Sequence, residues 1–192
     1  KINQKNLLFE EQHLERLRKA SRYFAYPFDP EILRQKIEAE CQTCDANQNY
    51  RLRIILSKPG EIEVERQVLT PLSPSFCQAQ LCLQEGNLQQ AFIYFKTTHR
   101  PHLSLGEQGK IYHNTRGELL ETSIGNLVLK IAGKLYTPPI RLGILPGIYR
   151  QHLLETGQVE EKILTLADLA QAEAIYGSNA VRGLYELSLE EN

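Results

Sequence analysis

The 192-residue chain has no excess of charge of either sign. Lys and Arg total 22, Asp and Glu total 23, and the formal net charge at pH 7 is −1. A protein that binds a nucleic-acid backbone or an anionic membrane surface normally carries a clear positive excess. The balance of charge therefore argues against a nucleic-acid partner.

The sequence also lacks a long apolar run. Its apolar stretches are far shorter than the roughly 20 residues that a membrane-spanning helix needs. Residues 1–5, Lys-Ile-Asn-Gln-Lys, do not form the apolar core of a signal peptide. These absences predict a protein without a membrane partner, and we expect it in the cytoplasm.

Cysteine is scarce, with four residues at positions 41, 44, 77 and 82. Cys41 and Cys44 form a C-x-x-C pair, which is a pattern of zinc and redox sites. A structural zinc site needs two tight ligand pairs, and the spacing from Cys77 to Cys82 is too wide for one. A redox motif would open a helix after a strand, whereas Cys41 ends a helical pattern. We interpret the four as reduced thiols without a functional role and predict no metal site.

The first part of the chain combines two helical patterns with a hairpin pattern. Residues 10–24 place apolar side chains at helical spacing, and a second helix is predicted from Asp29-Pro30 to about Cys41. From Tyr50 the period changes to two, with a turn signal at Pro59-Gly60 between two predicted strands.

A linker with Pro71 and Pro74 separates this part from the rest. We predict a small N-terminal α/β domain over residues 1–72 and a larger domain over residues 73–192. The larger domain is rich in strand patterns, predicted near 77–83, 92–96, 110–113, 119–123, 126–131, 163–165, 175–176 and 184–187. One helix is predicted after Pro146-Gly147 and a short one over 166–172. The fold class is mixed α/β.

Three segments of the larger domain form a further pattern, and they are Tyr94-Phe95-Lys96-Thr97-Thr98-His99-Arg100, Glu121-Thr122-Ser123-Ile124-Gly125-Asn126-Leu127 and Ile144-Leu145-Pro146-Gly147-Ile148-Tyr149-Arg150. In order and spacing they resemble the lysine segment, the glutamate segment and the phosphate loop of class IV aminotransferase-like enzymes. The closing Ser178-Asn179-Ala180-Val181-Arg182-Gly183 is similar to that of the aminodeoxychorismate lyase branch.

The resemblance implies a two-domain, fold-type IV (D-amino-acid aminotransferase-like) enzyme that uses pyridoxal 5′-phosphate (PLP) and forms a homodimer. It implies a small helix-plus-hairpin domain, here apparently without the family's first strands, and a larger PLP-binding domain. The segment between Arg100 and Lys110 is shorter than in the family, Leu103 stands about where a tyrosine is frequent, and Val128 replaces an aromatic residue.

The family's roles fall on named residues. Lys96 is the counterpart of the lysine that binds the cofactor covalently and then moves the substrate's α-proton. Glu121 matches the carboxylate that keeps the cofactor's ring nitrogen protonated. Gly147, Ile148 and Tyr149 match the helix start that holds the phosphate.

Three further residues are candidate contacts to the cofactor or the substrate. Arg16 matches the side chain that clamps the phosphate. Asn179 is a candidate polar contact to the cofactor, although an Asn there is as often a turn former. Arg100 is a candidate for holding a substrate carboxylate, and Arg150 is expected to pack or form a salt bridge.

Within the family, the Lys-Thr-Thr-x-Arg segment, the run from Tyr23 to Asp29 and the Asn-x-x-Arg-Gly ending resemble the lyase. We therefore expect conversion of 4-amino-4-deoxychorismate to 4-aminobenzoate and pyruvate in folate biosynthesis, by a chain that is fused to or works with aminodeoxychorismate synthase. Two alternatives stay open, namely a transaminase for branched-chain or D-amino acids and a non-catalytic module of the same fold.

Overall fold

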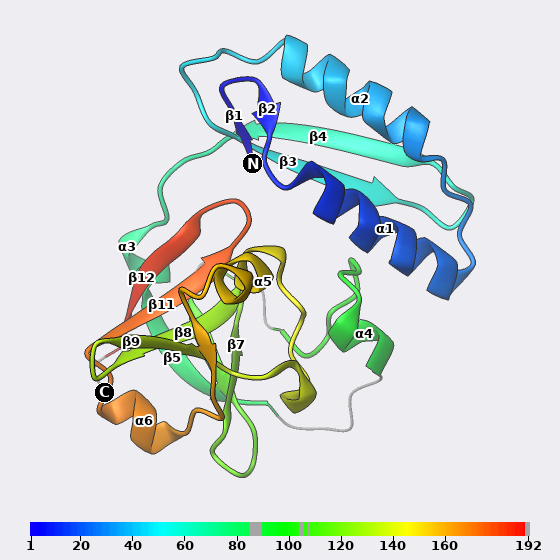
Figure 1. The fold of residues 1–192 in the computed structure, drawn as a ribbon. Helices are drawn as coiled ribbons and strands as arrows, with labels where there is room; N and C mark the ends of the chain where they lie inside the picture. Colours follow the sequence, from blue (N-terminus) through cyan, green and yellow to red (C-terminus); the bar gives the residue numbers. More distant parts are fainter. Residues whose placement is uncertain (85–89, 104–105, 107, 191–192) are drawn as a thin grey trace. The chain divides into compact units, whose positions relative to one another are not determined.

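The computed structural model describes residues 1–84, 90–103, 106 and 108–190. The chain forms two compact units, Lys1–Pro71 and Leu72–Asn192, and Figure 1 shows the elements of each. No helix in the described part of the chain is long and apolar enough to cross a membrane.

The N-terminal unit is a four-stranded antiparallel sheet with two helices. Its elements are β1 (Ile2–Asn3), β2 (Asn6–Leu7), α1 (Glu10–Phe24), α2 (Pro30–Gln42), β3 (Tyr50–Leu56) and β4 (Ile62–Val68). The strand order is β2-β1-β3-β4. The sequence pattern predicted both helices and the β3–β4 hairpin, but it predicted no strand ahead of α1, where β1 and β2 lie.

Local chemistry explains the two helices. The Asp29 carboxylate accepts hydrogen bonds from the backbone N–H groups of Glu31 and Ile32, so it caps α2 directly before Pro30. Leu14 of α1 and Leu33 of α2 are buried in one cluster with Ile62 of β4. The apolar stripes of both helices therefore pack on the hairpin.

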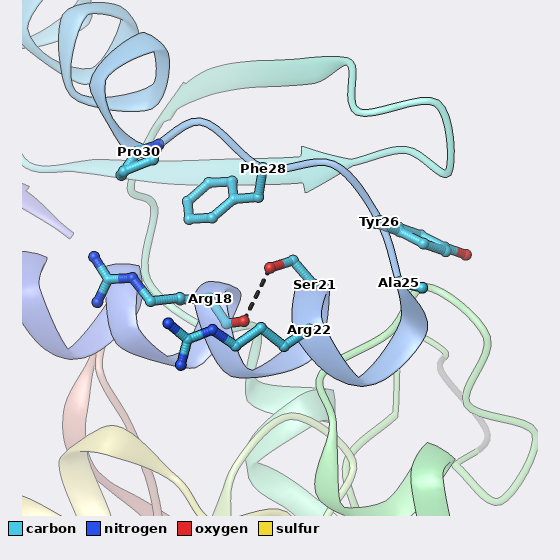
Figure 2. A pocket seen from close by; sticks show the side chains of 7 residues that line it. All are labelled: Arg18, Ser21, Arg22, Ala25, Tyr26, Phe28 and Pro30. Atoms are coloured by element: carbon cyan, nitrogen blue, oxygen red, sulfur yellow. Dashed lines mark hydrogen bonds between the residues drawn. The ribbon is translucent and has the colours of Figure 1, made fainter.

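A hollow lies where α1 leads into α2. It is lined by Arg18, Ser21, Arg22, Ala25, Tyr26, Phe28 and Pro30, as Figure 2 shows. Arg18 also pairs with Glu15 at 2.6 Å, so its charge is already partly matched within the helix.

The C-terminal unit is built around a sheet that closes on itself. Its elements are α3 (Pro74–Cys77), β5 (Gln78–Leu83), α4 (Gln90–Tyr94), β6 (Lys110–His113), β7 (Leu119–Thr122), β8 (Asn126–Ile131), β9 (Lys134–Thr137), the 3-10 helix η1 (Ile140–Leu142), α5 (Ile148–Glu155), β10 (Glu160–Glu161), α6 (Leu166–Ala170), β11 (Ala174–Asn179) and β12 (Gly183–Leu189). The strand order is β10-β9-β8-β11-β12-β5-β6-β7, and β7 pairs in addition with β8. The strands from β8 round to β7 therefore form a closed ring.

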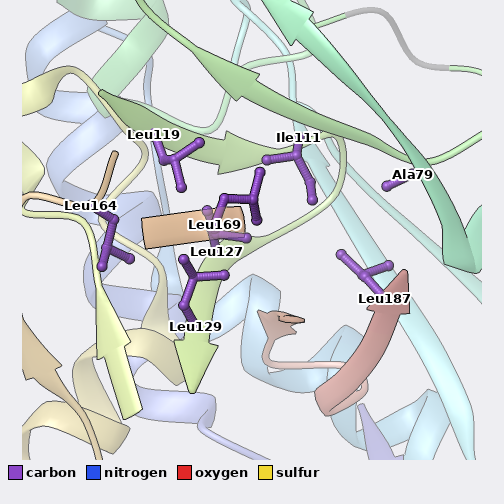
Figure 3. Packing of buried hydrophobic residues seen from close by; sticks show 8 residues of the cluster. All are labelled: Ala79, Ile111, Leu119, Leu127, Leu129, Leu164, Leu169 and Leu187. Atoms are coloured by element: carbon purple, nitrogen blue, oxygen red, sulfur yellow. The ribbon is translucent and has the colours of Figure 1, made fainter. Parts of the chain in front are cut away.

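Leucine side chains fill this ring. The buried cluster comprises Ala79, Ile111, Leu119, Leu127, Leu129, Leu164, Leu169 and Leu187, drawn in Figure 3. On β8, Leu127 and Leu129 belong to this cluster, whereas Val128 between them packs with Leu153 of α5 in a second one. Both faces of β8 are therefore covered in its middle, which explains why the three consecutive residues Leu127–Leu129 are all apolar.

Two glycines, Gly177 on β11 and Gly125 directly before β8, allow the Tyr185 side chain to approach the backbone closely. A Cβ atom at Gly177 would lie 2.2 Å from the Tyr185 ring, and one at Gly125 would lie 2.9 Å from the Tyr185 hydroxyl oxygen. Burial raises the pKa of Tyr185 to about 12, against the opposing hydrogen bonds from Thr122 and Asn179. The Tyr185 ring therefore occupies the space that a side chain at position 177 would need, while at position 125 the Ser178 backbone carbonyl oxygen, 2.5 Å from the Cβ position, is the nearer obstacle.

Two strand predictions were wrong. Residues 92–96 were predicted as a strand, but residues 90–94 form helix α4, because Ile93 is buried there and tertiary packing overrides the β propensity of an aromatic run. Residues 163–165 were predicted as a strand, but Leu164 points into the leucine cluster and Thr165 caps α6. The neighbouring strand is β10, and β9 was not predicted at all.

We expect Leu129→Ala to lower the free energy of unfolding by about 2–5 kcal/mol, because it leaves a cavity in the closed ring. Leu81→Ala is the control, because Leu81 is 42% exposed on β5, and it should cost less than about 1 kcal/mol. Urea unfolding followed by circular dichroism measures both. Equal losses would contradict the assignment of the core.

Candidate active site

The glutamate segment forms the tight turn between β7 and β8. Glu121 of β7 lies opposite Asn126 of β8 in the antiparallel pairing. The Thr122 N–H and hydroxyl both donate to the Gly125 carbonyl oxygen, at 2.8 and 2.9 Å, so the turn is held from the backbone and from the side chain. This turn closes the strand ring and fixes the side chains of Glu121 and Asn126 next to each other.

Glu121 lies in a buried polar cluster with Arg100, the last residue of the lysine segment, and with His102, two residues further along the chain. Its side chain is 3% exposed, that of Arg100 is 10% exposed, and that of His102 is fully buried. The Arg100 Nη2 group donates to Glu121 Oε1 at 3.2 Å. His102 Nε2 lies 3.4 Å from the same Arg100 nitrogen and 4.0 Å from Glu121 Oε1.

Opposing effects act on the pKa of the Glu121 carboxyl group. Burial raises the pKa of Glu121, although the Arg100 guanidinium, the Leu145 backbone N–H and the charge of Lys96 act in the opposite direction. A further cation beside this carboxylate would stabilise its charged form. A protonated ring nitrogen is such a cation, so Glu121 fits the role that the sequence resemblance implied.

The predicted phosphate loop is pressed against the same turn. Asn126 Nδ2 donates to the Leu145 carbonyl oxygen at 2.8 Å. A Cβ atom at Gly147 would lie 1.9 Å from Asn126 Oδ1, so only glycine fits there. The loop is therefore held at a fixed distance from β8.

Helix α5 begins directly after this glycine, at Ile148. Gly147 is its N-cap, and a glycine has no side chain with which to cap the helix start. Such a helix start offers N–H donors and the positive end of a helix dipole to an anion. Gly147, Ile148 and Tyr149 lie at this helix start, and their contact with a phosphate group stays a prediction.

Lys96 lies in the segment that follows α4, and its side chain is exposed. The charge of its ammonium group acts on Glu121, where it opposes the rise in the carboxyl pKa that burial causes. Lys96, Glu121 and the phosphate loop therefore belong to one unit of the chain, and the structure brings Lys96 and Glu121 into the same electrostatic neighbourhood.

Two predicted cofactor contacts, those of Arg16 and Asn179, stay predictions. Arg16 lies on α1 in the N-terminal unit, and its contact with a phosphate stays a prediction. Asn179 Oδ1 accepts from the backbone N–H groups of Val181 and Arg182, at 3.0 and 2.9 Å. This is the turn-forming arrangement that was the alternative for Asn179, and its contact with a cofactor also stays a prediction.

Arg100 has a partner that the sequence did not indicate, because Glu121 is 21 residues further along the chain. Its Nε atom is buried without a hydrogen-bond partner in the described part of the chain. Arg150 packs as expected, because it is 1% exposed and donates to the Pro138 carbonyl oxygen at 2.8 Å and to Glu161.

The sequence also did not single out His102, which contributes to the cluster around Glu121. Its only linear signal was a second histidine close behind Arg100, in His99-Arg100-Pro101-His102. The role of Asn126 was likewise missed, although Asn126 formed part of the recognised motif.

Known proteins resemble this chain over nearly its whole length. Residues 1–188 match the family model described as Amino-transferase class IV. The chain is 24% identical over 185 residues to a candidate aminodeoxychorismate lyase of Schizosaccharomyces pombe, covering 88% of this chain and 79% of that protein. It is 35% identical over 68 residues to an uncharacterized Haemophilus influenzae protein, and this match spans only 35% of either chain.

A solved structure supports the fold. The crystal structure of a candidate amino-acid aminotransferase from Mesorhizobium loti matches with a TM-score of 0.78 and 28% identity, covering 94% of this chain and 91% of that chain.

Gly147→Ala should lower the free energy of unfolding by about 1–3 kcal/mol, because its new methyl group meets the Asn126 amide. In the Asn126→Ala background the same change should cost less, since the obstructing amide is gone. Chemical unfolding of the two single variants and the double variant gives the coupling. Additive losses would show that residues 126 and 147 do not press on each other.

Proposed function

The chain belongs to the class IV aminotransferase family of PLP enzymes, and within that family we propose that it is a 4-amino-4-deoxychorismate lyase. The observation that carries the proposal is the segment Lys96-Thr97-Thr98-His99-Arg100, whose arginine bonds the buried Glu121. The name of the Schizosaccharomyces pombe relative supports the same activity. The products would be 4-aminobenzoate and pyruvate.

The residues that would hold the cofactor are Lys96, Glu121 and the loop Gly147–Tyr149, with Arg16 and Asn179 as further candidates. When bound, the cofactor supplies an electron sink conjugated with the substrate's amine. Glu121 would hold a proton on the ring nitrogen, since a buried carboxylate favours a charged neighbour. The first amide groups of α5 would bind the phosphate oxygens.

In the proposed reaction, the Lys96 amine takes the proton from the amine-bearing carbon of the substrate ring. The carbon–oxygen bond to the enolpyruvyl group breaks, and that group leaves and takes up a proton to become pyruvate. The ring becomes aromatic, which makes the elimination strongly favourable. Atoms balance without water or a second substrate, so a keto acid is not consumed.

We retain Arg100 as the candidate for a substrate carboxylate. A guanidinium has five N–H donors, and the Arg100 Nη2 group is bonded to Glu121. The Arg100 Nε donor is buried and has no partner in the described part of the chain, so Glu121 does not satisfy every donor of this guanidinium.

The second candidate is an amino-acid transaminase, and the Mesorhizobium loti match at 28% identity favours it. A module of this fold without catalysis would lack turnover of either kind. We also propose, from the resemblance of the sequence to the lyase branch, that the chain forms a homodimer and is fused to or works with aminodeoxychorismate synthase.

Lys96→Ala should abolish turnover and the visible absorption band of lysine-bound PLP while leaving the fold intact, because an exposed side chain contributes little to packing. Lys134→Ala is a matched control, because Lys134 is an exposed lysine that pairs with Glu160. Absorption spectra and circular dichroism of both variants test this. An unchanged visible band in the Lys96 variant would reject the assignment.

The lyase should convert aminodeoxychorismate to 4-aminobenzoate and pyruvate continuously without any added keto acid. A transaminase instead leaves the amine on the cofactor and stops unless a keto acid recovers it. Chromatography of 4-aminobenzoate over many turnovers, with and without 2-oxoglutarate, separates the two. Conversion of amino acids only in the presence of 2-oxoglutarate, with no 4-aminobenzoate formed, would replace the lyase by the transaminase.

A further inference from the structure

His102 is a buried imidazole for which the proposed reaction has no use. Its side chain is fully buried, and it lies against the Arg100–Glu121 ion pair. Its Nε2 atom is 3.4 Å from Arg100 Nη2, and its Nδ1 atom has no hydrogen-bond partner in the described part of the chain. A buried polar group without a partner calls for an explanation.

The chemistry of arginine fixes the direction of the hydrogen bond. A guanidinium has only donors, so His102 Nε2 must be the acceptor and the imidazole proton lies on Nδ1. The pKa of His102 is lowered to about 4, first by burial and then by the charge of Arg100, which agrees with a neutral ring. The charged groups that face this ring are Arg100 and Glu121.

The two hydrogens of the Arg100 Nη2 group thus have one acceptor each, Glu121 Oε1 on one side and His102 Nε2 on the other. The guanidinium plane is thereby fixed from two directions. If the imidazole were removed, one buried N–H would lose its acceptor, and the guanidinium would be free to turn away from the carboxylate.

We propose that His102 is a positioning residue, whose imidazole accepts from Arg100 and holds the guanidinium against Glu121, the carboxylate assigned to the cofactor's ring nitrogen. This inference rests on the proposed function, because it concerns the same cofactor site. The imidazole acts on the cofactor only through Arg100 and Glu121.

Three variants separate this role from simple packing. His102→Leu fills the site without an acceptor, and His102→Gln places an amide oxygen near the former Nε2 position. His113→Leu, at a half-buried histidine of β6 that bonds the Asn114 carbonyl oxygen, is the control. Each cofactor-free chain is titrated with PLP, and the dissociation constant and the pH midpoint of the visible band are measured.

We expect His102→Leu to weaken PLP binding about tenfold, which corresponds to about 1.4 kcal/mol, and to shift the pH midpoint of the band. His102→Gln and His113→Leu should both stay close to the wild type. If His102→Leu does not fold, His102→Asn replaces it, because its shorter amide remains polar but does not reach Arg100.

The Glu121→Gln background tests the route of the effect. There His102→Leu should change PLP binding and the band's pH midpoint little, because the carboxylate that it positions is gone. A wild-type band with His102→Leu and His102→Gln indistinguishable from wild type would overturn the inference and leave the proposed function standing. A wild-type chain without any PLP band would overturn both.

Discussion

The pairing of β7 with β8 is the constraint on which the C-terminal unit depends. It is short, with Glu121 opposite Asn126 and a turn held by Thr122 and Gly125. This pairing joins β7, at one end of the strand order, back to β8, so neither strand is left as an exposed edge at this point. The same closure places a buried carboxylate and a buried amide side by side, and from the amide the phosphate loop takes its position.

The Arg100–Glu121 ion pair is poor evidence for stability, because taking two charges out of water offsets much of their attraction. The ion pair is better explained by its effect on the charge of the Glu121 carboxylate. Burial raises the pKa of Glu121, and its cationic neighbours Arg100 and Lys96 act against that rise. A protonated ring nitrogen beside this carboxylate would likewise favour its charged form, as the role proposed for Glu121 requires.

The sequence predicted those features that are determined by residues close together in the chain. The apolar run of β8, the Pro146-Gly147 start of α5 and the capped start of α2 all follow from neighbouring residues. Helix α4 could not be predicted in this way, because its aromatic run favours a strand and tertiary packing decides otherwise.

For the site, a linear motif singled out Glu121 and Gly147 as candidates because their segments keep the family's spacing. The contacts of Arg100 and His102 with Glu121 join residues far apart in the chain, and no local pattern encodes them. The local pattern around Asn179 in turn left two interpretations open, and the structure shows its oxygen engaged by the following backbone.

The contact between Tyr185 and Gly177 has a consequence for how this sequence can vary. Because the ring fills the space beside the glycine, the two positions cannot change independently. A homologue with a larger residue in place of Gly177 must carry a smaller one in place of Tyr185. These two positions are therefore expected to covary, whereas Gly125 is held by the Ser178 backbone carbonyl oxygen, 2.5 Å from where its Cβ atom would lie, whatever residue stands at position 185.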